Sequence, residues 1–439
     1  MPWQPQARVK RALRTTTRSG LLAIMALAAF AGRPAAADPP SPPGMELATA
    51  LRRAAANLPK RTTVPQQQSG WQAVAMEGAT CGRGAPFKYY FNPASQPDAG
   101  LFILLSGGGA CLKDGPAPEG TTGVARSLYC MDFENFQDPA VNDQYFTGAL
   151  SGLIVPTVLP HFNRNDAANP FRAYHFVAVP YCTGDVFAGR MTAGYDYDPD
   201  PAASFDVTHR GHLNLMAVLE DLQSRVKGDV PVVLSGLSAG GFGAVFNFPE
   251  VIERWPRAML LPDSGMAPEI PGTLFDRQGP AVAARWGADA LLPDWCKDAA
   301  CLATQRLLAA HAEHFDGRRG PWRPFGYLQS QQDNVLTPYL ETTPCGYEIG
   351  LRAGFARQGG LPNLRAYLPA TDKHVFSIVA DSSNPLAGAR PFVSKRGVSF
   401  LDWFRKVATA QGVADLPPDM VDPYLACHDI HLASLRLGP

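Results

Sequence analysis

Residues 230–243 read Val-Pro-Val-Val-Leu-Ser-Gly-Leu-Ser-Ala-Gly-Gly-Phe-Gly, and the rest of the chain can be interpreted from this stretch. A short valine-rich run leads into a G-x-S-x-G pattern, and a helix-like segment follows. This order is typical of a nucleophile elbow, in which Gly236 and Gly240 leave room for a sharp turn that exposes the hydroxyl of Ser238. The helix that follows would point unpaired N–H groups at the same place. The stretch predicts a catalytic serine, and the simpler interpretation is a glycine-rich turn.

The overall composition excludes some classes of partner. Of the 439 residues 46% are hydrophobic, which is ample for a globular core. Lys and Arg together number 39, as do Asp and Glu, so the formal net charge is zero. A chain without net charge has no long-range field that attracts nucleic acid or an anionic membrane. We therefore expect no nucleic-acid partner and a substrate that is recognised by local features.

The N-terminus has the three parts of a signal peptide. Basic residues between positions 8 and 18 precede an apolar run at 21–31, and Ala35-Ala36-Ala37 offers a cleavage site. The apolar run is too short to cross a bilayer, and a retained anchor is the alternative. We expect an exported protein, periplasmic or secreted, without stable membrane insertion after cleavage. Its expected parts are a signal peptide at 1–37, a proline-rich disordered lead-in at 38–44 and one catalytic domain at 45–439.

Eight cysteines in an exported chain favour disulfide bonds. Cys296 and Cys301 are close enough in sequence for a local bond, and Cys111 with Cys130 is a plausible second pair. The pairing of the remaining cysteines stays open. A zinc site is the alternative, but no Cys-x-x-Cys pair supports it.

Other metal-binding patterns in the sequence are weak. His311 and His314 lie three residues apart, as do His428 and His431, but neither pair has an evident third ligand. Residues 196–201 alternate Asp with Tyr and Pro without the glycine and distal glutamate of an EF-hand. We interpret these features as exposed histidines and a solvated loop, and expect neither a metal nor an organic cofactor.

The apolar pattern predicts strands that alternate with helices. Such alternation indicates a mostly parallel sheet with helices on both faces. The sequence therefore predicts a single α/β domain with long loops, similar to the α/β-hydrolases. The expected strands are 88–91, 101–105, 174–180, 230–235, 258–261, 327–330 and 364–368, and the expected helical regions are 211–226, 281–310 and 399–410.

Polar or glycine-rich segments follow several of these strands, where an open parallel sheet gathers its active groups. In chain order they hold residues 107–109, Ser238, Asp263 or Asp333, and His374, which is the serine, acid, histidine order of an α/β-hydrolase triad. A histidine can take the proton of a serine hydroxyl, and a carboxylate orients the histidine. The residues alone make Asp263 and Asp333 nearly equal candidates for the catalytic acid. The expected donors to an oxyanion are the backbone N–H groups of Gly108, Gly109 and Ala239.

Five short stretches resemble the pectin acetylesterase/Notum family of serine carboxylesterases. They are residues 105–111, 181–185, 209–211, 236–241 and 263–265, in the same order and spacing as in the family. The resemblance implies an α/β-hydrolase fold, with Ser238 as nucleophile and His374 as base. It also implies that Asp333 is the catalytic acid, whereas Asp263 becomes a structural aspartate beside the site. The same donors, Gly108, Gly109 and Ala239, are implied for the oxyanion.

The sequence departs from the family at two positions next to the site. Ala110 stands where the family usually has tryptophan, and Ser106 where it usually has glutamate. Family members remove acetyl groups from pectin or a fatty acyl group from a protein, and the changed pocket leaves the substrate of this chain open. We expect an ester substrate, for example a short acyl group on a polysaccharide. A lipase, polyester depolymerase, peptidase or non-catalytic carbohydrate- or lipid-binding protein is the alternative. Candidate pocket residues are Ala110, Asp185, Arg210 and Asp263.

Overall fold

The computed structural model describes residues 70–114, 119–121, 128, 130, 159–195, 204–318, 321–358, 360–378 and 391–423. Four expectations fall outside these residues: the signal peptide, the lead-in, the loop at 196–201 and the histidine pair near the C-terminus. Among the described residues no helix is long and apolar enough to cross a membrane.

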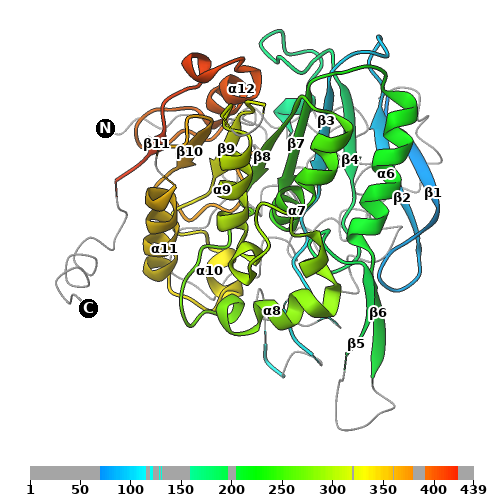
Figure 1. Ribbon diagram of the computed structural model, residues 1–439, viewed down its shortest axis with the longest axis vertical. Helices are drawn as coiled ribbons and strands as arrows, with labels where there is room; N and C mark the ends of the chain where they lie inside the picture. Colours follow the sequence, from blue (N-terminus) through cyan, green and yellow to red (C-terminus); the bar gives the residue numbers. More distant parts are fainter. Residues whose placement is uncertain are drawn as a thin grey trace, which may run out of the picture.

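A nine-stranded sheet forms the centre of the described fold, in the order β1-β2-β4-β3-β7-β8-β9-β10-β11 (Figure 1). The pairs β1–β2 and β2–β4 are antiparallel, and every pair from β4 to β11 is parallel. The strands are β1 (Gln72–Thr80), β2 (Pro86–Asn92), β3 (Leu101–Leu105), β4 (His175–Val179), β7 (Val232–Leu237), β8 (Ala258–Asp263), β9 (Phe325–Leu328), β10 (Leu364–Leu368) and β11 (Met420–Val421).

Successive side chains of a strand point to opposite faces of the sheet, and here each face has its own hydrophobic core. In β3, Ile103 packs in one core and Phe102 in the other. The first core includes α6 (Gly211–Arg225), α7 (Ala239–Arg254) and α9 (Thr304–His314). The second includes α12 (Phe400–Thr409). Helices therefore cover both faces, and the predicted α/β class with a mostly parallel sheet is confirmed.

The register of the parallel strands aligns their carboxyl ends at one edge of the sheet. Leu105 pairs with Gly236, Leu237 with Asp263, and Asp263 with Leu328. The segments that follow β3, β7, β8 and β9 consequently begin side by side. Figure 1 shows this edge beside the start of α7 and near α8 and α10. The edge is where the predicted catalytic residues were expected to meet.

The bounds of β3 and β10 agree with the expected strands, and α6 ends one residue before the expected helix. The region expected to be helical at 281–310 contains part of α8, part of α9 and two short 3₁₀ helices. The sequence patterns did not predict several further elements. One of them, β1, is largely exposed and lacks a continuous apolar run. These elements are β1, β11, the hairpin of β5 (Met191–Tyr195) and β6 (Phe205–His209), the first seven residues of α8 (Leu274–Trp286), α10 (Leu336–Tyr339) and α11 (Pro344–Arg357).

Three disulfide bonds lie within the described residues. Cys111–Cys130 and Cys296–Cys301 confirm the two expected pairs. The third, Cys81–Cys182, joins residues 101 positions apart, and Cys345 is disulfide-bonded as well. A cross-link stabilises the folded chain mainly by restricting the unfolded one. Disulfides of this number are typical of proteins from an oxidising compartment.

His311 corrects the expectation of an exposed histidine. It is fully buried against the first core, where Trp295 Nε1 donates to its Nδ1 over 3.1 Å and its Nε2 lies 3.0 Å from the carbonyl of Val245. Burial lowers the pKa of His311 to about 4. The three-residue spacing of His311 and His314 does not indicate burial, because residues with this spacing share a helix face that can lie against the core or in solvent.

The buried imidazole of His161 predicts that the folded protein becomes less stable as the pH falls. Burial among phenylalanines, helped by nearby Arg405, lowers its pKa to about 3 from 6.5. The folded state therefore keeps this ring neutral, whereas the unfolded chain binds a proton below pH 6.5. The stability that results is present above pH 6.5 and is lost progressively between there and pH 3, at about 1.4 kcal/mol per pH unit for this one side chain.

The variant His161→Phe should flatten that dependence, because neither ring nitrogen has a hydrogen-bond partner among the described residues. The measurement is urea unfolding of both proteins at pH 7, 6 and 5, followed by tryptophan fluorescence. We expect the wild type to lose more stability than the variant across this range. Equal losses in the two proteins would show that His161 is not the titrating group.

Candidate active site

Ser238 occupies the turn between β7 and α7 with a backbone that non-glycine residues rarely adopt. Its φ is 55° and its ψ is −119°. A Cβ atom on Gly236 would overlap the backbone of Gly240, and one on Gly240 would overlap the carbonyl of Leu105. Larger residues at either position would push the turn open. The G-x-S-x-G pattern thus has a steric cause here, and the strain it stores is typical of a functional turn.

The backbone of Ser238 is anchored on both sides. Its N–H donates to the carbonyl of Asp263 at the end of β8 over 2.9 Å, and its own carbonyl accepts from Phe242 over 3.1 Å. The side chain is only half-buried. Because Ala239 is the first residue of α7, its N–H belongs to the unpaired donors at a helix start. The hydroxyl is therefore held next to a helix N-terminus and remains accessible.

The glycine loop after β3 runs directly beside this turn. A Cβ on Gly107 would lie 2.6 Å from the carbonyl oxygen of Leu237 and 2.9 Å from the Cβ of Ser238. Gly109 has a φ of 85°. The backbone N–H groups of Gly108 and Gly109 donate to no other described residue. The structure thus places free backbone donors of the loop on the same edge as Ser238. Gly107, which makes the closest approach, belongs to the segment 107–109 expected at this edge but was not among the expected oxyanion donors.

Gly107→Ala should damage activity more than stability. The new methyl group must move either the glycine loop or the elbow, because the atoms nearest to it belong to the backbone of Leu237 and the Cβ of Ser238. A displacement of about 1 Å can cost about 100-fold in rate, so we expect kcat to fall by about that factor on a p-nitrophenyl ester. The matched control is Gly412→Ala, where a Cβ meets nothing within 4 Å. An unchanged kcat for Gly107→Ala would contradict the close packing of loop and elbow.

His374 is paired with Asp333 in the loops after β10 and β9. Its Nδ1 lies 2.7 Å from Oδ2 of Asp333, and both side chains are buried. Asp333 also accepts from Gln329 Nε2 over 2.7 Å and from the backbone N–H groups of Val335 and Leu336 over 2.9 and 2.8 Å. A carboxylate only accepts hydrogen bonds, so Nδ1 of His374 carries the proton and Nε2 presents a lone pair.

The other ring nitrogen of His374 has no partner. Nε2 is buried and makes no hydrogen bond within the described part of the chain. Buried polar atoms are nearly always satisfied, and exceptions occur where a substrate or catalytic group completes the site. A lone pair held in this way can accept a proton from a hydroxyl that approaches it.

Asp263, the other candidate acid, makes different contacts. Its carboxylate accepts from the backbone N–H groups of Phe376 and Ser377 over 2.8 and 2.6 Å. None of its described hydrogen bonds reaches the imidazole of His374. Of the two aspartates that the residues alone left even, the structure thus brings only Asp333 to the histidine. Asp263 is fully buried, so it does not line a substrate pocket.

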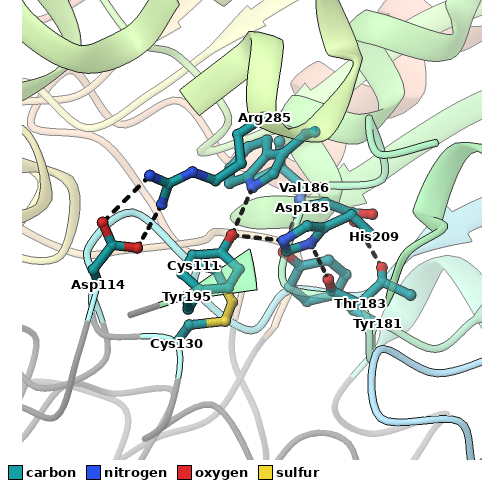
Figure 2. The surroundings of a disulfide bond; sticks show 11 residues. Cys111, Asp114, Cys130, Tyr181, Thr183, Asp185, Val186, Tyr195, His209 and Arg285 are labelled. Atoms are coloured by element: carbon teal, nitrogen blue, oxygen red, sulfur yellow. Dashed lines mark hydrogen bonds and ion pairs between the residues drawn. A yellow bond between two sulfur atoms is a disulfide. The ribbon is translucent and has the colours of Figure 1, made fainter. Parts of the chain in front are cut away.

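Asp185 also proves unsuited to the pocket position expected for it. It is fully buried and accepts from Thr183 Oγ1 over 2.6 Å, from Phe187 N–H over 3.1 Å and from Gly211 N–H over 2.7 Å. Figure 2 shows it beside Thr183. Asp185 therefore fastens the loop after β4 to the start of α6, and a substrate cannot reach it.

The two remaining pocket candidates lie on different segments. Arg210 immediately precedes α6 and is half-buried, and its Nε has no hydrogen-bond partner among the described residues. Ala110 is 6% exposed and closes the glycine loop.

The segment after the glycine loop is tied down at two points. Cys111 is bonded to Cys130, and Asp114 forms an ion pair with Arg285 of α8 at 2.7 Å (Figure 2). The guanidinium of Arg285 lies 5.0 Å from the ring centre of Tyr195 in β5. An exposed ion pair contributes little by itself, so the disulfide is the stronger restraint. Together these contacts hold the glycine loop against α8 and the β5–β6 hairpin.

Residues 157–273 match the family model described as Pectinacetylesterase. This region is similar to the pectinacetylesterase family. It contains Ser238 and Asp263, and it confirms the resemblance seen in the sequence. By its name, the matched family consists of carboxylic ester hydrolases. The glycine loop, Asp333 and His374 lie outside the matched residues, and the tertiary structure brings their strand ends to the same edge of the sheet.

Two crystal structures of the Wnt deacylase Notum from Drosophila resemble the whole described fold. One covers 82% of this chain and 98% of its own, and the other 81% and 97%; both share 17% sequence identity with a TM-score of 0.50. This likeness supports the α/β-hydrolase-like fold that the pectinacetylesterase region predicts. None of the curated proteins matches the chain. The described residues contain no group of three or more side chains that could hold a metal ion.

Proposed function

We propose that this chain is an exported serine carboxylesterase that hydrolyses an oxygen ester through Ser238, His374 and Asp333. The observation that carries the proposal is the buried Asp333–His374 pair, with a bond of 2.7 Å on Nδ1 and an unpartnered Nε2. It lies on the sheet edge that also carries the strained, accessible Ser238. These are the parts that a nucleophilic serine requires.

The reaction follows from the roles of these groups. Ser238 Oγ attacks the ester carbonyl while His374 Nε2 takes its proton, and the N–H groups of Gly108, Gly109 and Ala239 bind the oxyanion that forms. His374 then returns the proton to the leaving alcohol, which leaves an acyl group on Ser238. Water, deprotonated by His374, attacks this acyl-enzyme and releases the acid and the free serine. Asp333 holds the ring and stabilises the imidazolium in both halves.

The family name supports a short acyl group on a carbohydrate as the substrate, because the matched family acts on acetylated pectin by its description. The related crystal structures are of a deacylase, and the small Ala110 would leave room for a larger group. We therefore propose O-acetyl or another short acyl group first, and a longer acyl group second. Export is supported by the disulfide bonds, which form in oxidising compartments.

The test is hydrolysis of p-nitrophenyl acetate, butyrate and palmitate by the purified protein and by its Ser238→Ala variant. We expect turnover that is highest on the acetate and absent in the variant. A preference for palmitate would move the assignment to a lipase. A folded protein with no turnover on any ester and no labelling by a fluorophosphonate would indicate a binding protein on the same fold.

A further inference from the structure

Asp263 contacts both the turn that carries Ser238 and the loop that carries His374. Its backbone carbonyl, at the end of β8, accepts from the N–H of Ser238 over 2.9 Å. Its carboxylate accepts from the N–H groups of Phe376 and Ser377, which follow His374 on the neighbouring loop. The strands β7 and β10 are not neighbours in the sheet. One buried residue on β8 thus joins the serine turn to the histidine loop.

Ser264 adds a third bond to the same loop. Its hydroxyl donates to Asp263 Oδ1 and accepts from the N–H of Val375, both over 3.0 Å. Three successive N–H groups, at 375, 376 and 377, are therefore all held by Asp263 and Ser264. Burial raises the pKa of the Asp263 carboxyl, and these hydrogen bonds oppose that rise. Such a set of donors around one carboxylate gives the loop a single backbone position.

The backbone next to His374 is strained. Val375 has a φ of 55°, which is a true outlier for a β-branched residue. Ser264 has a φ of 59°. Strain of this kind persists only where the surroundings over-determine the conformation. The three hydrogen bonds supply that restraint at the residue directly after His374.

We infer that Asp263, with Ser264, is a positioning residue that holds the loop after His374 and so aims the imidazole at Ser238. The inference rests on the proposed function. Asp263 occupies a strand end from which an acid could serve this fold, but its carboxylate is bonded to backbone and acts on the reaction through the histidine loop. Its loss should therefore lower the rate of the chemical step without weakening the binding of a small ester.

The first test is Asp263→Asn, which keeps the shape of the side chain but turns one acceptor oxygen into a donor that faces backbone N–H groups. Because a misplaced catalytic group can cost about 100-fold, we expect kcat on p-nitrophenyl acetate to fall by about that factor, with KM within about twofold. Labelling by a fluorophosphonate should slow by the same factor as kcat.

Asp422→Asn is the matched control. Asp422 is also fully buried and also accepts from two backbone N–H groups, those of Ala370 and Lys395, over 3.1 and 3.0 Å. Its replacement removes the same kind of interaction away from the residues that follow His374. We expect its kcat to stay within about threefold of the wild type below the melting temperature, because Asp422 accepts from Ala370 and Lys395 and not from the residues that follow His374.

Ser264→Gly decides the question if Asp263→Asn does not fold. Glycine suits the positive φ of this position, so the variant should fold while it loses the acceptor for Val375 N–H. We expect kcat to fall about tenfold, as for the loss of one hydrogen bond that orients a reacting group, with KM unchanged. Wild-type kcat in Asp263→Asn or, where that variant does not fold, in Ser264→Gly would overturn the inference, as would an equal loss in Asp422→Asn. A Ser238→Ala variant as active as the wild type would instead overturn the proposed function.

Discussion

Replacing Ser238 with alanine should lower kcat by about a million-fold, the effect of removing the nucleophile from comparable triads. Without Oγ no acyl-enzyme can form, and His374 has no hydroxyl from which to take a proton. The half-buried position of Ser238 means that the loss of one oxygen leaves little cavity. The measurement is kcat on p-nitrophenyl acetate, with the melting temperature as a check that the variant is folded.

Ser224→Ala is the control for this experiment. Ser224 is an exposed serine of α6 whose hydroxyl donates to the carbonyl of Asp221 over 2.6 Å. The Ser224→Ala variant should keep full activity. Ser224 lies near the C-terminal end of α6, whereas the pocket candidate Arg210 precedes the N-terminal end of this helix. If Ser238→Ala retained the activity of this control, the proposed nucleophile would be wrong.

The second large effect is expected for Asp333→Asn, at about 10⁴-fold in kcat. An amide at this position either donates to Nδ1 of His374, which forces the proton onto Nε2, or turns its NH2 group toward Val335 and Leu336, whose two N–H groups then lose their acceptor. In the first case the ring can no longer take a proton from Ser238. The steady-state rate on the acetate ester measures the loss, and the melting temperature separates it from unfolding.

The comparison of Asp333→Asn with Asp263→Asn distinguishes the two aspartates. We expect the larger loss for Asp333, because its carboxylate is bonded to the imidazole, and the smaller for Asp263, whose carboxylate accepts from backbone N–H groups and the Ser264 hydroxyl. A larger loss for Asp263→Asn would make Asp263 the acid and would mean that the His374 ring turns toward it in the working enzyme.

Local features of the chain were predictable from sequence because they have local causes. Gly236 is required by its contact with the backbone of Gly240, four residues away, and a pattern of small residues shows this directly. The strand at Leu101–Leu105 is an unbroken apolar run, as expected where both faces of a sheet are covered. Short sequence separation also made the Cys296–Cys301 bond predictable.

Features that join distant segments needed the tertiary structure. Asp263 and Asp333 both follow strands and look alike in sequence; only the path of the loops decides which carboxylate meets His374 and which meets backbone. Asp185 was expected in the pocket because it belongs to a motif that resembles the family. A motif does not indicate how deeply a side chain is buried, and Asp185 is fully buried.

The sequence by itself determined the elbow, the order of the strands along the chain and the residue types available for catalysis, since these depend on neighbours a few positions away. Only the structure showed which acid pairs with His374, that His311 is buried, and that Asp263 bonds both the serine turn and the histidine loop. The physical reason is that strand register and loop path set which side chains meet at the edge of the sheet, and both arise from packing across the whole domain.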